Sequence, residues 1–352
     1  MKRLFIFISI VLVTFWSNTI LAQTLVTQVK TTSGKWGYIN LYGETVIPAI
    51  YQKCYPFACN LATVFDDSTS QFQFLTISGE KIKTDITNFT LLDDGVSGLG
   101  MIVMSEGMIP VKNDKWGYLN TSGKLVIPQK YDEADLFHEG CAVVRANGQY
   151  FIINKQGKEI PVNIPGIIRL KNFSEGLAAF ELAGGRSGYI DITGRVVIQP
   201  MYNDAGNFSN GLAWAKAQND EVGFIDHKGT WVIKPSFDKG GDFDSISCLA
   251  RVKSTGFWVY SQRDGKVKYF MNTKNFGEFK NGFAIGEKTG KYGFFNSNAE
   301  WVIEPQFDAV KDFKNGYAAA KLGEKWGIID KHGSWVIDPQ YLAIKNMELV
   351  TE

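Results

Sequence analysis

Histidine is scarce in this chain, with only three among 352 residues. They are His138, His227 and His332, and the repeat pattern described below places the last two in equivalent turns of different units. Hydrolytic sites of the Ser-His-Asp or Cys-His type need a histidine in contact with the nucleophile. The sequence offers no such grouping, so we predict that the protein has no catalytic residues and is not an enzyme.

Cysteine is almost as rare, and the four cysteines do not form a Cys-x2-Cys pair of the kind that binds zinc. The Asx-x-x-Gly turns that recur along the chain supply one carboxylate each, whereas calcium takes roughly six to eight oxygens. We therefore predict no metal and no cofactor. Cys54 and Cys59 share one expected loop and are either bridged or free, while Cys141 and Cys248 are expected to be separate core residues.

Neither sign of charge is in excess, because 37 Lys and Arg are matched by 36 Asp and Glu. Proteins that bind nucleic acid usually carry a basic face or tail, and no block of like charges occurs here. We therefore predict no nucleic-acid partner. With 45% hydrophobic and 14% aromatic residues, the chain can nevertheless form an extended core.

Long hydrophobic runs are absent except at the N-terminus. Lys2 and Arg3 precede an apolar run at residues 4–16, and Ala22 ends a small-residue cleavage site. The run is shorter than the roughly 20 apolar residues that span a bilayer. We predict a signal peptide at residues 1–22, a repeat β domain at residues 23–352, and no stable membrane span after cleavage. The expected location is extracytoplasmic: periplasmic, cell-surface or secreted.

A Lys-Trp-Gly-aromatic motif, in contrast, recurs along the whole chain. With the motif glycine as reference, nine units align at a mean spacing of (327 − 37)/8, about 36 residues. The reference positions are Gly37, Gln73, Gly117, Phe151, Gly188, Gly223, Val259, Gly293 and Gly327. Repetition at this period is typical of stacked architectures, because one short unit cannot bury its own apolar face.

Each unit contains three predicted strands. The motif strand ends in Asn or Asp with a glycine three residues on, as in Asn120 to Gly123, which is typical of a hairpin turn whose last residue has positive φ. A β-branched pair such as Val126-Ile127 follows, and Pro128 is expected to end that strand because it cannot donate to a ladder. A loop ending in Phe-x-x-Gly then leads to the third strand. The chain is therefore predicted to be all-β.

The ends of the sequence set the phase of the repeat. Residues 25–30 match the third strand of other units, and the sequence stops where the last unit would begin its own third strand. The predicted fold is a tandem array of about nine three-stranded β-meander units. Two arrangements are open, an elongated twisted β-repeat array and a closed propeller-like ring. Propellers typically have about four to eight blades of four strands, so the elongated array is favoured.

The stretch from Lys115 to Ala142 carries, in order, Lys-Trp-Gly-Tyr, Asn-x-x-Gly, Val-Ile-Pro, Tyr-Asp and Phe-x-x-Gly. This order resembles the WG-repeat (KWG-repeat) proteins of bacteria, and the resemblance extends over nearly the whole chain after residue 22. Gln73, Phe151 and Val259 depart from the pattern. The resemblance implies β-rich repeats of largely uncharacterised role, often exported or fused to other domains, and it brings no catalytic residue.

Two sets of side chains recur along the repeat, and each has either a structural role in the fold or a role in contacting a ligand. Acidic residues follow the aromatic residue after the proline at Asp132, Asp238 and Asp308, and we expect them to cap loop amides. The tryptophans recur in two phases: Trp36, Trp116, Trp258 and Trp326, and Trp231, Trp301 and Trp335. We expect these rings to be wedges in the core, and the alternative is an exposed aromatic platform.

These features favour an exported, non-enzymatic protein that binds or scaffolds a protein or a cell-envelope polymer, because repeat arrays present extended faces. The alternative is a carbohydrate-binding module that uses exposed aromatic platforms. A third possibility is an enzyme sited in the degenerate stretch at residues 84–107.

Residues that depart from the repeat are the candidate partner contacts. Trp214 replaces the small residues found at its position in other units, and the spacing from Gln73 to Gly117 is 44 (117 − 73), which indicates extra residues near 83–107. The candidates are Trp214, Asn88, Phe89, Met101 and Met104. Insertions in repeat proteins often lie on the binding face, and methionine packs adaptably. Residues 88–100 are predicted to form either a recognition segment or a plain surface loop.

Export is expected to remove residues 1–22, because the charged start and the Leu21-Ala22 context match a cleavage site. N-terminal sequencing of exported protein should begin at Gln23. A mature protein that retains residues 5–16 would contradict this prediction.

Overall fold

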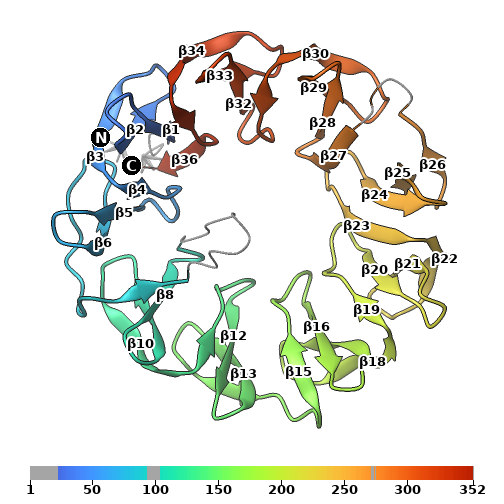
Figure 1. Cartoon of the computed structure of the whole chain (residues 1–352). Coiled ribbons are helices and arrows are strands. Elements are labelled where there is room, and N and C mark those ends of the chain that lie inside the picture. The colour runs from blue at the N-terminus through green and yellow to red at the C-terminus, as the bar shows by residue number, and fades with distance from the viewer. Residues whose placement is uncertain (1–22, 93–103, 271–272, 274, 352) are drawn as a thin grey trace, which may run out of the picture.

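The computed structural model describes residues 23–92, 104–270, 273 and 275–351. The predicted signal peptide lies outside these residues, as do Met101 and most of the predicted insertion. All regular elements in the described part of the chain are β-strands. They form nine small antiparallel sheets arranged around a ring, so the fold is a closed nine-bladed β-propeller (Figure 1).

The blade that closes the ring contains β1 (Gln23–Lys30), β2 (Trp36–Asn40), β3 (Thr45–Tyr51), β35 (Ala343–Ile344) and β36 (Glu348–Thr351). The next blades contain β4 (Lys53–Cys54), β5 (Ala62–Asp66) and β6 (Gln71–Leu75); β7 (Thr90–Leu91), β8 (Met108–Lys112), β9 (Trp116–Asn120) and β10 (Leu125–Tyr131); and β11 (Glu133–Ala134), β12 (Cys141–Ala146), β13 (Gln149–Asn154) and β14 (Glu159–Pro161). They are followed by β15 (Ile167–Leu170), β16 (Leu177–Leu182), β17 (Ser187–Asp191) and β18 (Val196–Tyr202), and by β19 (Asp204–Ala205), β20 (Ala213–Lys216), β21 (Val222–Ile225) and β22 (Trp231–Phe237). The last three blades contain β23 (Lys239–Phe243), β24 (Leu249–Ser254), β25 (Phe257–Gln262) and β26 (Val267–Lys268); β27 (Asn275–Lys280), β28 (Phe283–Lys288), β29 (Lys291–Phe295) and β30 (Trp301–Phe307); and β31 (Ala309–Val310), β32 (Tyr317–Leu322), β33 (Lys325–Asp330) and β34 (Trp335–Tyr341).

A typical blade is an antiparallel meander of four strands that runs from the centre of the ring outward, as in β11-β12-β13-β14 (Figure 1). In eight of the nine blades the three predicted strands are present, and a further strand joins them on the axial side. The blade of β4, β5 and β6 has only three strands, because the outermost predicted strand is reduced to an isolated bridge between Leu75 and Lys81. In most blades this innermost strand has two residues, such as Glu133–Ala134. Two residues carry no hydrophobic periodicity, which is why the sequence pattern does not indicate this strand.

The ring closes because the first strand of the chain pairs with the last two. Val29 of β1 lies opposite Ile344 of β35, and Gln23 lies opposite Thr351 of β36. Thr27 Oγ1 also donates a hydrogen bond to the Lys345 carbonyl at 2.9 Å. The elongated array that the sequence favoured is therefore not formed. The free edge of β1 needs a partner strand, and the C-terminal residues supply it.

The hydrophobic core is divided among the interfaces between successive blades. One cluster joins Ile127 and Tyr131 of one blade to Phe137 and Val144 of the next. The closing interface is built in the same way, from residues of β1 and β35 packed against β33 and β34. Each blade therefore buries its apolar faces only against its neighbours, as in other repeat architectures.

Hydrogen bonds also link one blade to the next. The buried Tyr118 hydroxyl donates to the Asp135 carbonyl of the following blade at 2.8 Å. The same bond, spanning 17 residues, recurs from Tyr38, Tyr189 and Tyr260. On the loops that end in Phe-x-x-Gly, the Glu139 carboxylate accepts hydrogen bonds from the amides of Glu175 and Gly176 one blade further on, at 2.6 and 2.8 Å. These bonds fix the angle between neighbouring blades.

The motif glycine is required by the outermost strand. A Cβ on Gly117 would lie 2.5 Å from the Ile127 carbonyl oxygen, and the corresponding distance is 2.3–2.6 Å at all six motif glycines. The close approach arises at a β-bulge, where the register between β9 and β10 shifts between Ile127 and Tyr131. Strand β10 continues through Pro128 to Tyr131. The expectation that the proline ends the strand was therefore wrong, because a bulge on an edge strand accommodates proline.

The predicted hairpin turns and caps are confirmed. Gly123 has a φ of 79°, and the Asn120 side-chain oxygen accepts hydrogen bonds from two turn amides. Ala299, the exception in sequence, adopts the same conformation at a φ of 68°. The recurring aspartates each accept a hydrogen bond from an amide of the next hairpin: Asp132 from Asn147, Asp238 from Gly256 and Asp308 from Gly323.

Gly117→Ala should destabilise the protein by about 3 kcal/mol, because the added Cβ overlaps backbone atoms that cannot move independently of the bulge. Urea unfolding monitored by circular dichroism measures this change. Gly277→Ala is the matched control, because its Cβ would lie 3.9 Å from the nearest atom, and it should change stability by less than about 1 kcal/mol. Equal losses for the two variants would refute this account of the motif glycine.

Candidate ligand site at the ring closure

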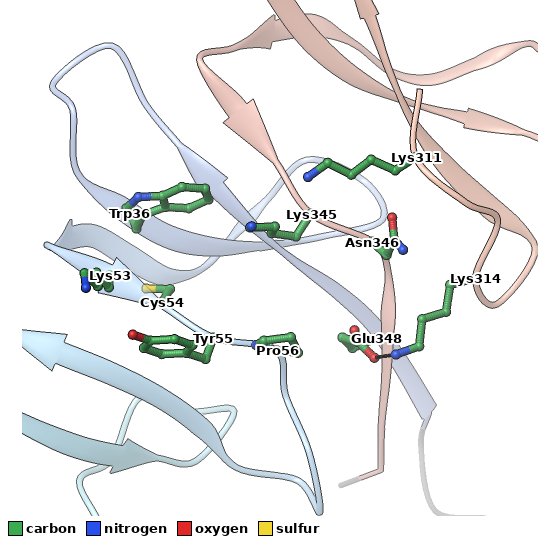
Figure 2. Close-up of a pocket in the computed structure, with 10 residues that line it drawn as sticks. All are labelled: Trp36, Lys53, Cys54, Tyr55, Pro56, Lys311, Lys314, Lys345, Asn346 and Glu348. Atoms are coloured by element: carbon green, nitrogen blue, oxygen red, sulfur yellow. Dashed lines mark ion pairs between the residues drawn. The ribbon is translucent and has the colours of Figure 1, made fainter. Parts of the chain in front are cut away.

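A cavity of about 410 Å³ lies where the closing blade meets the blades on either side of it. We call it the closure cavity (Figure 2). It is lined by Trp36, Lys53, Cys54, Tyr55, Pro56, Lys311, Lys314, Lys345, Asn346 and Glu348. Most of these residues belong to the innermost strands β4 and β36 or to the loops that follow β31 and β35, so the cavity opens on the axial side of the ring.

The cavity carries a surplus of positive charge. Lys314 forms an ion pair with the nearly buried Glu348 at 2.6 Å, which Figure 2 marks with a dashed line. Among the residues that the structure describes, Lys53, Lys311 and Lys345 have no carboxylate within ion-pair distance. Four lysines and one glutamate therefore line a single cavity.

Two of these lysines are held in place by carbonyl and ring contacts. Lys311 Nζ donates a hydrogen bond to the Ile344 carbonyl at 2.7 Å and lies 5.4 Å from the centre of the Trp326 ring. Lys345 Nζ lies 5.8 Å from the centre of the Trp36 ring, and Figure 2 shows the two side chains approaching each other. Contacts of this kind stabilise an ammonium group by cation–π attraction. They do not neutralise its charge.

The surroundings alter the protonation of two groups in the cavity. Burial, and after it the nearby charge of Lys345, lower the pKa of Lys311 to about 8. Burial raises the pKa of Glu348, and the hydrogen bond and charge of Lys314 oppose this rise. Lys311 therefore titrates close to the physiological range.

The repeat provides an internal comparison for these lysines. Lys311 and Lys345 directly follow the innermost strands of two neighbouring blades. The equivalent position in the other blades is held by Tyr55, Leu92, Asp135, Lys171, Gly206, Gly241 and Gly277. The fold therefore does not require lysine at this position, and a lysine there in two neighbouring blades is particular to the closure.

Lys171 is the single equivalent lysine elsewhere, and its local contacts match those of Lys311. Its Nζ donates to the Ala205 carbonyl at 2.7 Å and lies 5.5 Å from the centre of the Trp214 ring. Acidic residues lie close by, however. The pKa of Asp242 is raised, first by burial and then by Glu278, and the charge of Lys171 opposes both effects.

The candidate contacts named from the sequence lie in different places. Trp214 is half-buried, with its ring against the backbone of Gly206, where it fills space left by glycine. Asn88 is exposed. Phe89 and Met104 are buried together in the core between two blades, where Phe89 stacks on Phe74. Met101 lies outside the described residues, so the structure brings no group of these candidates together at the surface.

The recurring tryptophans are neither fully buried nor a free platform. Trp36, Trp116 and Trp326 are half-buried, and each has a lysine ammonium 5.4–5.8 Å from its ring centre. Trp231, Trp301 and Trp335 are also half-buried, and they pack edge-on against Tyr202, Phe295 and Phe307. These rings are wedges between blades, with one edge reaching solvent.

Three exposed aromatic residues lie instead at one end of the blade formed by β23–β26. Phe257 is 73% exposed, Tyr269 is 64% exposed and Trp258 is 37% exposed. Because Tyr260 of β25 lies opposite Lys268 of β26, the start of β25 and the residues after β26 lie at the same end of the blade. We call these three residues the aromatic surface. Its sequence signal is the departure of the Val259 unit from the motif, which the repeat pattern alone marks only as degeneracy.

The four cysteines are free thiols. Cys54 and Cys141 are buried, whereas Cys59 and Cys248 are exposed. Cys54 and Cys59 are therefore not bridged, and the expectation that Cys248 is a core residue was wrong. Across the described ranges, no three or more His, Cys, Asp or Glu side chains are grouped so as to hold a metal ion. The same residues include no helix long and apolar enough to cross a membrane.

These features define a nine-bladed repeat β-propeller with a cationic cavity at the point of closure. The model of the WG containing repeat matches the chain at residues 36–68, 116–150, 188–220, 223–256, 292–326 and 326–347. These matches cover more than half of the sequence, so the chain belongs to the WG-repeat family. No curated protein shows significant sequence similarity to it.

Solved structures with a similar arrangement share little sequence with this chain. A eukaryotic initiation factor is 12% identical with a TM-score of 0.61, over 93% of this chain and 98% of the other. BamB from Moraxella catarrhalis is 13% identical with a TM-score of 0.44, over 80% and 94% of the two chains. AztD from Citrobacter koseri is 10% identical with a TM-score of 0.43, over 95% and 99%. The first similarity supports the fold alone, and the other two are too weak to support a conclusion.

The lowered pKa of Lys311 makes stability depend on pH. Folded Lys311 loses its proton near pH 8, whereas an unfolded lysine loses it near 10.5. Between these values the unfolded chain binds more protons, so this group makes the free energy of unfolding rise with pH. The free energy of unfolding of wild type, measured with urea, should rise relative to that of Lys311→Met between pH 7 and pH 9.5. A constant difference between the two proteins would contradict the assigned pKa.

Proposed function

We propose that this protein is an exported, non-enzymatic binding protein that engages a protein or a cell-envelope polymer through the aromatic surface. The observation that carries the proposal is the exposure of Phe257, Trp258 and Tyr269 at one end of a single blade. Aromatic residues are enriched at the energetic centres of protein interfaces. Exposed apolar groups that lie close together on a soluble protein commonly mark such sites.

The surrounding fold suits a binding role. Each blade is fixed to the next by a shared core and by hydrogen bonds such as that from Tyr118 to Asp135. A rigid support lowers the entropic cost of ordering the surface on binding. Arg251 stacks on Trp258 with its guanidinium carbon 4.0 Å from the ring centre, which holds one of the three aromatic rings in a fixed position.

The experiment compares capture of partners from a cell-envelope extract by immobilised wild type and by the double variant F257S/Y269S. Trp258 is left unchanged because its contact with Arg251 is part of the blade. We expect a partner that wild type retains and that the double variant loses by at least about tenfold, since both substitutions remove exposed aromatic contact area. Fractionation of cells should place the protein outside the cytoplasm.

Tyr42→Ser is the matched control, because Tyr42 is 85% exposed on a hairpin turn of the closing blade. It should capture the partner as well as wild type does. Equal capture by all three proteins, or none by wild type, would overturn the proposal. Binding of isolated neutral glycans that is lost in the double variant would instead support the carbohydrate-binding alternative.

A further inference from the structure

We propose that the closure cavity binds a compact multivalent oxyanion, either a diphosphate or a small di- or tricarboxylate. This inference concerns a second site, and it does not depend on the aromatic surface or on its partner. Three observations carry it: the unpaired charge of the cavity, its volume, and the comparison with the other blades.

The unpaired charge indicates the chemistry of the ligand. Lys53, Lys311 and Lys345 line the cavity without a carboxylate partner in the described part of the chain, and the carboxylate of Glu348 is already engaged by Lys314. Ammonium groups in one partly enclosed space repel one another. An anion with several charged oxygens would relieve this repulsion and accept hydrogen bonds from more than one lysine. Lysine is a regular ligand of phosphate and carboxylate groups.

The volume indicates the size of the ligand. About 410 Å³ falls within the range of roughly 300–1,000 Å³ that small-molecule sites occupy. The lining residues come from three successive blades, so a ligand that contacts both Lys53 and Lys311 must span the closing blade. This arrangement favours an anion with separated charges over a single monovalent ion.

The comparison with the other blades argues against a purely structural role. Glycine holds the position of Lys311 in three blades, at Gly206, Gly241 and Gly277. Those blades keep the same strand order without a lysine. The fold does not require these lysines, and their like charges repel one another. Such an arrangement is typical of a ligand site.

Isothermal titration calorimetry of the purified protein with pyrophosphate and with citrate tests the proposal. We expect wild type to bind at least one of the two anions and not the neutral sugar N-acetylglucosamine. Preference for pyrophosphate would identify a phosphate ligand, and preference for citrate a carboxylate ligand. Lys311→Met and Lys345→Met should each weaken binding by about tenfold or more, the loss expected for one charge-assisted hydrogen bond.

Lys171→Met is the matched control. Lys171 makes the same carbonyl and ring contacts as Lys311, but it lies near Asp242 and outside the cavity. Its replacement should leave affinity within about twofold of wild type, because no ligand hydrogen bond is lost. If Lys311→Met does not fold, the Lys345→Met variant still tests the site, because Lys345 is exposed and its replacement leaves the core unchanged. Absence of binding to either anion, or an equal loss in the Lys171 variant, would overturn the proposal.

The pH dependence of citrate binding provides an independent readout. The other charged residues that line the cavity are Lys53, Lys314, Lys345 and Glu348, and the charge of Lys345 acts directly on Lys311. Because the pKa of Lys311 is about 8, wild type should bind citrate more weakly at pH 9 than at pH 7. Lys311→Met should show a smaller change over the same interval. An identical pH profile for both proteins would count against the participation of Lys311.

Discussion

Burial of apolar side chains between neighbouring blades is the interaction on which the whole molecule depends. A blade has no core of its own, so each must cover both of its faces with other blades. An open array of nine blades has eight interfaces and leaves two apolar faces in water, whereas a closed ring has a ninth interface. That ninth interface is filled by Val29, Ile39 and Ile344 packed against Ile328 and Ile337. Closure is therefore favoured by the same burial that joins every other pair of blades.

The turns and caps of this protein could be predicted from its sequence, because each depends on residues that lie close together along the chain. Asn120 and Gly123 define a turn within four residues, and Asp132 caps the hairpin that follows it. The motif glycine was recognised as a reference point, but its cause is the bulge around Pro128 on the neighbouring strand. A bulge depends on the pairing of two strands, and neither strand shows it alone. The same limit applies to the short inner strands.

The closed ring was one of two arrangements that the sequence left open, and the closure cavity could not be derived from the sequence for a related reason. The pairing of β1 with β35 joins segments from opposite ends of the described chain, and the phase of the repeat at these ends is compatible with a ring and with an open array. Lys53, Lys311 and Lys345 come from three different repeat units, and none of them stands out in the sequence from the other lysines of the chain. They form a site only because the ring brings three blades together. Trp214 stood out from the repeat, yet its ring fills the space above Gly206.

The closing strand pairing also governs how the chain reaches its native state. The hydrogen bond from Thr27 to the Lys345 carbonyl spans 318 positions, so the closing blade is assembled from segments synthesised at very different times. Contacts of such long sequence separation slow folding, because loop-closure entropy is lost before they form. Blades made entirely from adjacent strands can form earlier. The edge of β1 stays unpaired until β35 and β36 are available. The pairing of residues 343–351 with β1 completes the ring and the closure cavity together.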